Sequence, residues 1–261
     1  MTTIYIDIGN SFLKIKNKDK NIFLKENNSL FLELDEKQKE HFFENLKVDE
    51  KESIKVFVSS VNEKMKNSVI NFLEQKFQAE IFYLSFEKQN LIKIENYQAD
   101  SEKKHEIGSD IIANAIAANS FYPQKKTLIV SLGTAIVYFV LYKQKIEGVA
   151  IDVGFNKSIT TFFNSLWNDE KINALWLNYE ADLLGLDTKN AISAGIINSK
   201  VMAIKGYIKL LKEQYQIEQV VFTGGDFSFL SKKITEMLHY SFDFEPEMVI
   251  SGLEIWSKTF N

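Results

Sequence analysis

Residues 4–16 read IYIDIGNSFLKIK, which places a carboxylate and a glycine turn at the end of an apolar strand. Residues 4–8 have the composition of a buried strand interrupted by Asp7, and residues 12–15 form a second extended run. The Gly-Asn-Ser sequence at 9–11 predicts a tight hairpin, in which Asp7 bonds to the turn amides. The same residues are also typical of a phosphate-binding hairpin, because glycine lets backbone N–H groups approach an anion.

A second hairpin of the same form begins in the middle of the chain. Residues 128–139 read LIVSLGTAIVYF, which repeats the pattern of IYIDIGNSFLKI at residues 4–15. The aligned pairs are 124 residues apart: Asp7 with Ser131, Gly9 with Gly133, and Asn10 with Thr134. Each hairpin begins one half of the chain, which indicates an internal duplication. The pairing favours two phosphate loops of one nucleotide site over two plain hairpins.

Composition restricts the classes of function. The chain has 261 residues, 45% of them apolar, a formal net charge of −4 and no cysteine. It therefore lacks a basic footprint for nucleic acid and cannot form disulfides or use thiolate chemistry. No apolar run approaches the ~18 residues that span a bilayer. The three histidines, His41, His105 and His239, have no zinc-ligand spacing. These observations predict a cytoplasmic protein that binds neither nucleic acid nor membrane.

The duplicated strand–glycine turn–strand unit resembles the actin, hexokinase and sugar-kinase superfamily. DIGNS (7–11) and SLGTA (131–135) are similar to its two phosphate loops, and TGGD (223–226) is similar to its adenosine loop. The resemblance implies an α/β fold with duplicated actin-like (ribonuclease H-like) domains and a nucleotide cleft between them. With YPQKK (122–126) as the linker, the expected domains are 1–122 and 123–261.

Within this superfamily the sequence resembles the type III pantothenate kinases over nearly its whole length. Seven motifs occur in the order of that family: DIGNSFLK (7–14), SSV (59–61), GSD (108–110), LGTA (132–135), GVAIDVG (148–154), LDTKNAISAGI (186–196) and TGGD (223–226). The resemblance implies ATP-dependent phosphorylation of pantothenate in coenzyme A synthesis, with Mg²⁺, a monovalent cation (K⁺ or NH₄⁺) and a homodimer. The alternatives are a catalytically impaired relative that binds nucleotide or regulates, and a kinase of another small hydroxylated substrate.

The resemblance also implies roles for individual residues. Asp110 would be the general base, although an aspartate before IIANAIAA also suits a helix N-cap. The residues expected to bind ATP phosphates and Mg²⁺ are Asp7, Ile8, Gly9, Asn10, Ser11, Lys14, Gly133 and Thr134, with Gly224 and Gly225 for the adenosine. The residues expected to bind pantothenate are Gly108, Ser109, Asp110, Ile111 and Thr188. Three alternatives remain open: a solvated strand lysine for Lys14, a helix N-cap for Thr188, and a plain strand-to-helix turn for Gly224 and Gly225.

Several positions depart from the family pattern. Ile111 stands where the family has arginine, and Ser131 stands where it has an aspartate that helps to bind the monovalent cation. A serine hydroxyl brings no charge, so the sequence predicts a weak cation site, unless a carboxylate such as Asp152 replaces the missing one. Tyr97 is the tyrosine nearest to the position of the family's substrate-contacting tyrosine.

Overall fold

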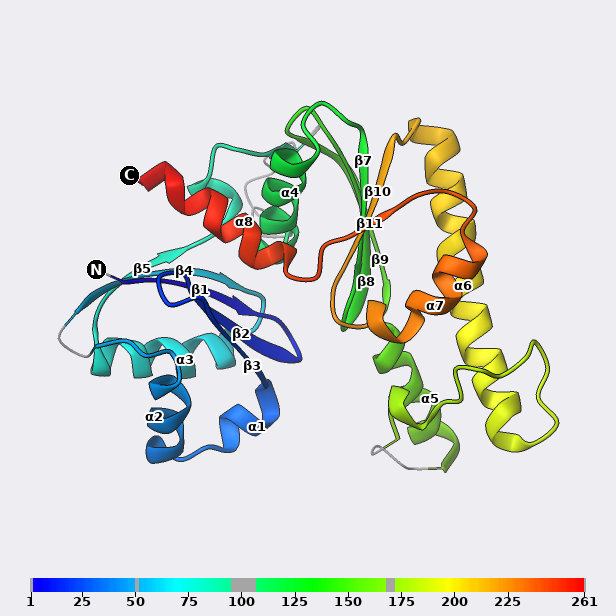
Figure 1. The fold of residues 1–261 in the computed structure, drawn as a ribbon, viewed down its shortest axis with the longest axis horizontal. Helices are drawn as coiled ribbons and strands as arrows, with labels where there is room; N and C mark the ends of the chain where they lie inside the picture. Colours follow the sequence, from blue (N-terminus) through cyan, green and yellow to red (C-terminus); the bar gives the residue numbers. More distant parts are fainter. Residues whose placement is uncertain (1, 50–51, 95–106, 168–171, 261) are drawn as a thin grey trace. The chain divides into compact units, whose positions relative to one another are not determined.

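The structure is a computed structural model that describes residues 2–49, 52–94, 107–167 and 172–260. The chain forms two compact units, one from Met1–Phe121 with Met248–Asn261 and one from Tyr122–Glu247 (Figure 1). The chain enters the second unit one residue earlier than the linker predicts. Residues 248–261, which we expected in the second domain, pack with the first unit instead.

The first unit is built on a five-stranded sheet in the order β3-β2-β1-β4-β5. The first three strands are antiparallel neighbours, and β4 and β5 run parallel to β1. The sheet strands are β1 (Thr2–Ile8), β2 (Phe12–Asn17), β3 (Ile22–Asn27), β4 (Ser53–Ser60) and β5 (Gln78–Tyr83). The other elements are α1 (Asn28–Glu33), α2 (Glu36–Glu44), α3 (Glu63–Lys76), η1 (Phe86–Lys88), β6 (Lys93–Ile94), α4 (Ser109–Phe121), α8 (Met248–Ser257) and η3 (Lys258–Phe260).

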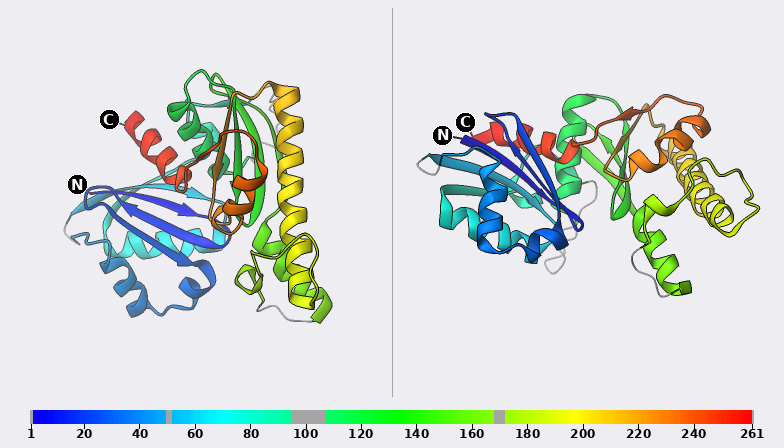
Figure 2. Two further views of the ribbon diagram at one scale, coloured as in Figure 1. Left: turned by 45° about the vertical axis from the view of Figure 1, so that its right-hand side comes forward. Right: turned by 60° about the horizontal axis from the view of Figure 1, so that its bottom comes forward.

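Helices cover both faces of this sheet (Figure 2). Ile4, Ile6 and Ile8 of β1 pack in one core with residues of α1, α2 and α3. On the opposite face, the hydroxyl of buried Tyr5 lies 3.0 Å from Ser257 Oγ, in α8. Side chains alternate along a strand, so Asp7 points to the same face as Tyr5, the face that α4 and α8 cover.

The second unit repeats this plan. Its own strands follow the order β9-β8-β7-β10-β11, in which β7, β8 and β9 are antiparallel neighbours and β10 and β11 run parallel to β7. The strands are β7 (Thr127–Leu132), β8 (Ala135–Tyr142), β9 (Lys145–Val153), β10 (Gln219–Thr223) and β11 (Asp243–Phe244). The helices are α5 (Phe155–Trp167), η2 (Ala174–Trp176), α6 (Thr188–Tyr215) and α7 (Phe227–Met237). The internal duplication predicted from the two hairpins is confirmed, because both sheets share one strand order and one set of directions.

The core of the second unit lies on one face of its sheet. Leu128, Val130 and Leu132 of β7 pack with residues of α5, α6 and α7. By alternation, Ile129 and Ser131 point to the other face. This alternation decides which polar groups can act together at the end of β7.

Candidate functional site

The first hairpin turn connects β1 to β2 without a left-handed residue. The Gly9 N–H donates to the Phe12 carbonyl at 3.0 Å, and Asn28 at the start of α1 donates its side-chain N–H to the Gly9 carbonyl at 2.8 Å. Gly9 does not adopt a positive φ, and a Cβ added there would come no closer than 3.5 Å to its neighbours. Neither backbone conformation nor packing therefore requires a glycine at this position.

Asp7 and Lys14 face each other across this hairpin. They are register partners, and Lys14 Nζ lies 3.6 Å from a carboxylate oxygen of Asp7, which is only 6% exposed. Lys14 is not the solvated strand lysine of the alternative reading, because its side chain is mostly buried beside this carboxylate. The Ile8 side chain lies in the core and its carbonyl accepts a bond from Val61 N–H at 3.0 Å, so neither group is directed to a ligand.

The start of α4 is fixed to the strand next to Asp7. Asp7 pairs in register with Ser59 of β4, and Ser59 Oγ lies 2.9 Å from Ser109 Oγ. Ser109 Oγ also accepts from Ser60 N–H at 2.8 Å. Both serines are buried. The structure therefore brings two predicted elements together on one face of the first sheet: the Asp7 hairpin and the Gly108-Ser109-Asp110 helix start.

Asp110 lies in the first turn of α4 and is not its N-cap. The helix begins at Ser109, and an Asp110 carboxylate oxygen accepts from the adjacent Ile111 N–H at 2.9 Å. A Cβ at Gly108 would lie 2.4 Å from this carboxylate, so glycine is required for the observed position of Asp110. Burial raises the pKa of the Asp110 carboxyl above its ordinary value, and the bond from Ile111 partly offsets the rise. The carboxylate is thus a stronger base than an exposed one.

The second hairpin turn and the TGGD loop form one structure in the second unit. Gly133 N–H donates to the Ala135 carbonyl at 3.1 Å, as Gly9 does in the first turn, and Gly133 also lacks a positive φ. Gly224 is different: its φ is +92°, and a Cβ there would lie 2.3 Å from the Leu132 carbonyl. The predicted phosphate loop and adenosine loop are therefore in contact, and Gly224 is required by the turn itself.

Two residues that hold these loops were missed in the sequence. Asp226 N–H donates to the Leu132 carbonyl at 3.0 Å, and the Asp226 carboxylate accepts from Asn156 N–H in α5 at 3.1 Å. Gly154 N–H donates to the Thr134 carbonyl at 3.0 Å, and a Cβ at Gly154 would lie 2.0 Å from the Gly133 carbonyl. Both residues end quoted motifs, TGGD and GVAIDVG, so the signal was present, but their partners are distant in sequence.

Asp152 does not supply the charge that Ser131 lacks. Asp152 pairs in register with Ile136, whose side chain is in the core beneath α5 to α7, whereas Ser131 points to the opposite face. The Asp152 carboxylate instead accepts from Lys200 Nζ of α6 at 3.0 Å. The register partners of Ser131 are Val137 and Thr223, which bring one hydroxyl and no carboxylate. This donor set does not fit a site built around a carboxylate.

The remaining residues singled out in the sequence have mixed outcomes. Thr188 begins α6 and is exposed, and the N-cap is Asp187, whose side chain accepts from Asn190 N–H, so the capping alternative for Thr188 is wrong. Ile111 is buried in α4. Tyr97 lies outside the described residues. Gly225 is exposed beside Gly224, and Asn10 and Thr134 are exposed at their turns.

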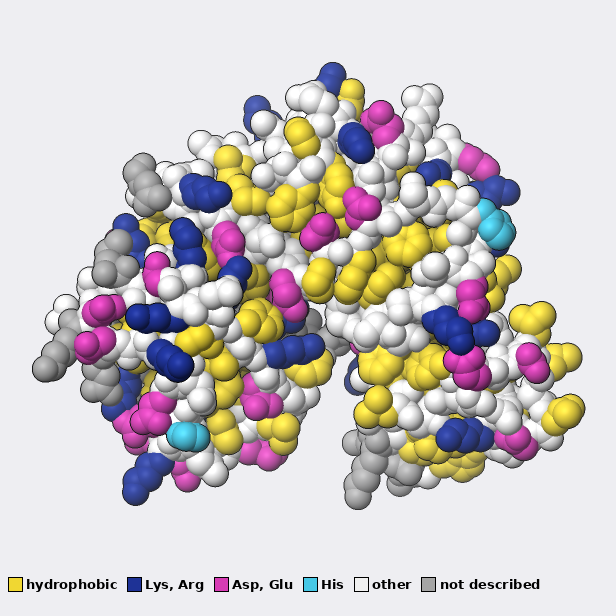
Figure 3. All heavy atoms as spheres, in the orientation of Figure 1, with side chains coloured by type: hydrophobic (Ala, Val, Ile, Leu, Met, Phe, Trp, Pro, Cys, Tyr) yellow, Lys and Arg dark blue, Asp and Glu magenta, His cyan; other side chains and the backbone are white. Residues whose placement is uncertain are grey.

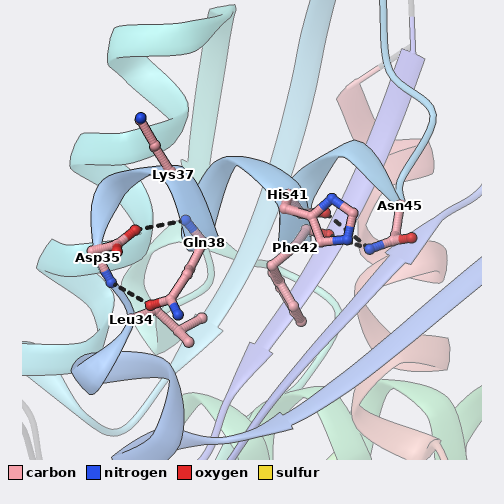
Figure 4. A pocket seen from close by; sticks show the side chains of 7 residues that line it. All are labelled: Leu34, Asp35, Lys37, Gln38, His41, Phe42 and Asn45. Carbon is pink, nitrogen blue, oxygen red and sulfur yellow. Dashed lines mark hydrogen bonds between the residues drawn. The ribbon is translucent and has the colours of Figure 1, made fainter.

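Two cavities are present in the first unit. One, of about 530 Å³, is lined by Gly108 and Ser109 together with residues of β4, α3 and β5. The other, of about 500 Å³, lies along α2 and is lined by no predicted site residue (Figure 4). Its polar groups Asp35 and Gln38 bond each other's backbone in a capping box, so they stabilise the helix end. The first cavity is the candidate for a substrate.

The described residues contain no cluster of three or more histidine, cysteine, aspartate or glutamate side chains suited to a metal ion. A single carboxylate such as that of Asp7 is compatible with Mg²⁺, because this ion is commonly held by one or two carboxylates together with substrate phosphates and water. In the described part of the chain, no helix has the length and apolarity to cross a membrane.

Comparison with known proteins identifies the family of this chain. The family model for type III pantothenate kinase matches residues 3–210. The chain belongs to the type III pantothenate kinase family. A type III pantothenate kinase from Petrotoga mobilis is 31% identical over 77% of this chain and 74% of its own length. Another from Mycoplasma mobile is 26% identical over 98% of this chain and 99% of its own.

Solved structures support the fold of this kinase family member. A Baf family protein from Campylobacter jejuni is 22% identical, with a TM-score of 0.56 and 99% coverage of both chains. Component A of (R)-2-hydroxyglutaryl-CoA dehydratase from Acidaminococcus fermentans is 12% identical, with a TM-score of 0.56 and full coverage of both chains. At such identities the likeness concerns the fold alone. The predicted fold class, α/β with duplicated actin-like units, is confirmed.

Proposed function

We propose that this chain transfers the γ-phosphoryl group of ATP to pantothenate, giving 4′-phosphopantothenate and ADP, the first step towards coenzyme A. Family membership supports the reaction. The observation that carries it is the link from Asp7 through Ser59 to Ser109, which holds a phosphate-type turn and a buried carboxylate on one face of the first unit.

Asp110 acts as the general base. The primary hydroxyl of pantothenate loses its proton to the Asp110 carboxylate as its oxygen attacks the γ-phosphorus, and ADP leaves with the former bridging oxygen. Gly108 lets the carboxylate fold back against the helix start, and Ile111 N–H orients it. The raised pKa of the Asp110 carboxyl makes its carboxylate a stronger base for this proton.

The two hairpin turns serve the phosphates of ATP. Asn10, Ser11 and Thr134 follow the two glycines, whose own N–H groups close the turns. The missing side chains of Gly9 and Gly133 leave room for phosphate oxygens. Mg²⁺, held by Asp7 and phosphate oxygens, would offset the charge on the phosphates. Gly224 and Gly225 receive the adenosine, and Thr188 contacts pantothenate.

We infer that the chain needs no monovalent cation. Ser131 and Thr223 contribute neutral oxygens, and Asp152 points to the other face of the sheet. A hydrated K⁺ or NH₄⁺ ion gains too little from two hydroxyls to replace its water.

We further propose a cytoplasmic homodimer. The second unit exposes large apolar side chains on α5 and α6, and hydrophobic atoms reach the surface around these helices (Figure 3). The exposed residues include Leu166, Trp167, Met202, Tyr207 and Leu210. Aromatic residues and methionine are enriched in interface cores.

One assay tests the reaction and its alternatives. Purified full-length protein is supplied with ATP, Mg²⁺ and pantothenate, and ADP is monitored together with the phosphorylated product. ADP release that depends on pantothenate supports the proposal. Binding of ATP without turnover would favour the catalytically impaired relative, and turnover with a different small alcohol would favour the third alternative.

A further inference from the structure

The cavity beside the start of α4 has the size of a small-molecule site. Its volume of about 530 Å³ lies within the range of ~300–1,000 Å³ that ligand pockets occupy. Gly108 and Ser109 line it, and they immediately precede the proposed general base. Tyr83 and Phe86 add aromatic surface to the lining. A substrate whose hydroxyl reaches Asp110 can therefore extend its chain into this cavity.

Among the described residues that line the cavity, Lys66 is the one with a positive charge. It lies in the second turn of α3, and its side chain is 23% exposed. Its ammonium lies 5.5 Å from the centre of the Tyr83 ring, a distance at which a cation is attracted to the ring face. The aromatic ring and the partial burial restrict where the charge can lie.

The pair between Lys66 and Glu63 shows that the ammonium is placed to bind a carboxylate. Lys66 Nζ lies 2.7 and 2.6 Å from the two Glu63 carboxylate oxygens. Glu63 is 78% exposed, and exposed ion pairs between neighbouring turns contribute little free energy. A ligand carboxylate can therefore take the place of Glu63. Glu87, the other carboxylate among the described lining residues, is exposed.

The position on α3 adds to the attraction. Asn62 caps this helix by accepting from Met65 N–H, so the helix begins at Glu63, the ion-pair partner of Lys66. The positive end of the helix dipole favours an anion within the first turn. The Lys66 ammonium and the positive end of the helix dipole therefore both attract a carboxylate in the cavity.

Pantothenate has the reacting hydroxyl at one end and a carboxylate at the other, and the carboxylate needs a cationic partner. Ile111, where the family has arginine, is buried and brings no charge. We propose that Lys66 binds the pantothenate carboxylate and makes this kinase selective for the acid over neutral analogues. The inference rests on the proposed function, because it names how that substrate is held.

The test compares Lys66→Met with Lys64→Met, a matched control two residues away on the same helix. Lys64 is exposed and does not line the cavity. We expect Lys66→Met to raise KM for pantothenate about 10- to 100-fold, the effect of losing a hydrogen bond to a charged group, with kcat little changed. Lys66→Arg retains most of the affinity, and Lys64→Met behaves as the native protein.

A neutral analogue gives a second readout. Panthenol carries an alcohol in place of the carboxylate, and its inhibition constant against pantothenate should be the same in native protein and Lys66→Met. A KM for pantothenate unchanged by Lys66→Met, or an equal loss of panthenol binding, would overturn the role of Lys66 while the kinase activity stands. Absence of pantothenate-dependent ADP release from the native protein would instead overturn the proposed function, and the role of Lys66 with it.

Discussion

Asp110, the proposed general base, lies in surroundings that disfavour its charged form. Its carboxyl pKa is raised chiefly by burial, so the folded chain holds this proton more tightly than the unfolded chain does. The stability associated with this group is therefore fully present below its unfolded pKa and is lost as pH rises through the higher folded pKa. A carboxyl group whose pKa is shifted by burial in this way is a common feature of active sites.

The substitution Asp110→Asn separates the proposed contribution of the carboxylate to catalysis from its effect on stability. We expect kcat to fall by about 10²–10⁴, the usual contribution of a general base. The melting temperature at pH 7 should stay the same or rise, because the variant removes a carboxyl group whose charged form is disfavoured by its surroundings. In the native protein, kcat/KM should decline on the acid side at a pH above the ordinary carboxyl pKa, and this limb should disappear from the residual activity of the variant. Near-normal kcat would remove Asp110 from the mechanism.

Ser131 is the residue that decides the cation requirement. Its register partners, Val137 and Thr223, bring no carboxylate. We expect the activity of the native protein to change less than about 2-fold when K⁺ replaces a large inert cation at constant ionic strength, since neutral oxygens hold such an ion weakly. Ser131→Asp should introduce K⁺ activation. Strong activation of the native protein by K⁺ or NH₄⁺ would contradict the argument.

At the scale of elements, the glycine of the second hairpin turn and the first glycine of the TGGD loop differ in backbone conformation and in the space around them. Gly133 has an ordinary φ and space for a Cβ, whereas Gly224 has a φ of +92° and presses against the Leu132 carbonyl. We expect Gly133→Ala to leave the melting temperature unchanged or slightly higher and to weaken ATP binding about 10-fold or more, because the methyl group occupies the space of a phosphate oxygen. Gly224→Ala should lower the free energy of unfolding by about 1–3 kcal/mol or more.

Thermal unfolding measures the stability of each variant, and calorimetric titration with Mg²⁺-ATP measures its ATP affinity on the same samples. Gly9→Ala in the first turn should behave as Gly133→Ala, because its added Cβ also meets only ordinary contacts. Unchanged ATP affinity in both variants, with the fold intact, would show that these turns do not approach phosphate.

The contact between α4 and α8 is the closest helix pairing in the first unit. Gly252 of α8 lies against Ala113 of α4, where an added Cβ would be 2.0 Å from the Ala113 carbonyl. Gly252→Ala should lower the free energy of unfolding by about 1–3 kcal/mol, the usual effect of overpacking. Gly206→Ala in α6, where nothing lies within 4 Å, is the control and should be neutral or stabilising. Equal stability of the two variants would show that α8 does not pack as described.

At the scale of the whole molecule, oligomerisation is the main expectation. We expect a dimer mass by light scattering at micromolar concentration. Leu166→Asp combined with Leu210→Asp, on α5 and α6, should shift this mass to a monomer, because charges in an apolar interface core are strongly unfavourable. A native monomer at these concentrations would contradict the proposal, and a mass unaffected by the substitutions would place the interface elsewhere.

Much of the local structure was determined by the sequence alone. The apolar runs and glycine turns at residues 4–15 and 128–139 predicted both strand–turn–strand hairpins, which the structure contains. These features depend on interactions between residues close in sequence, which short patterns record. The duplication was readable for the same reason, because each half begins with the same strand–turn–strand pattern.

Tertiary structure decided the features that depend on packing and on register between distant strands. Alternation along β9 turned Asp152 away from Ser131, towards Lys200. The Gly-Asn dipeptide at 9–10 forms its turn without a positive φ, whereas Gly224 has a positive φ. Gly224 also lies against the Leu132 carbonyl, in a strand that is distant in sequence. The last helix returned to the first unit, where Tyr5, Phe57 and α4 offered an uncovered apolar face. No pattern within 248–261 could specify that partner, since the face that α8 buries is assembled from residues over a hundred positions away.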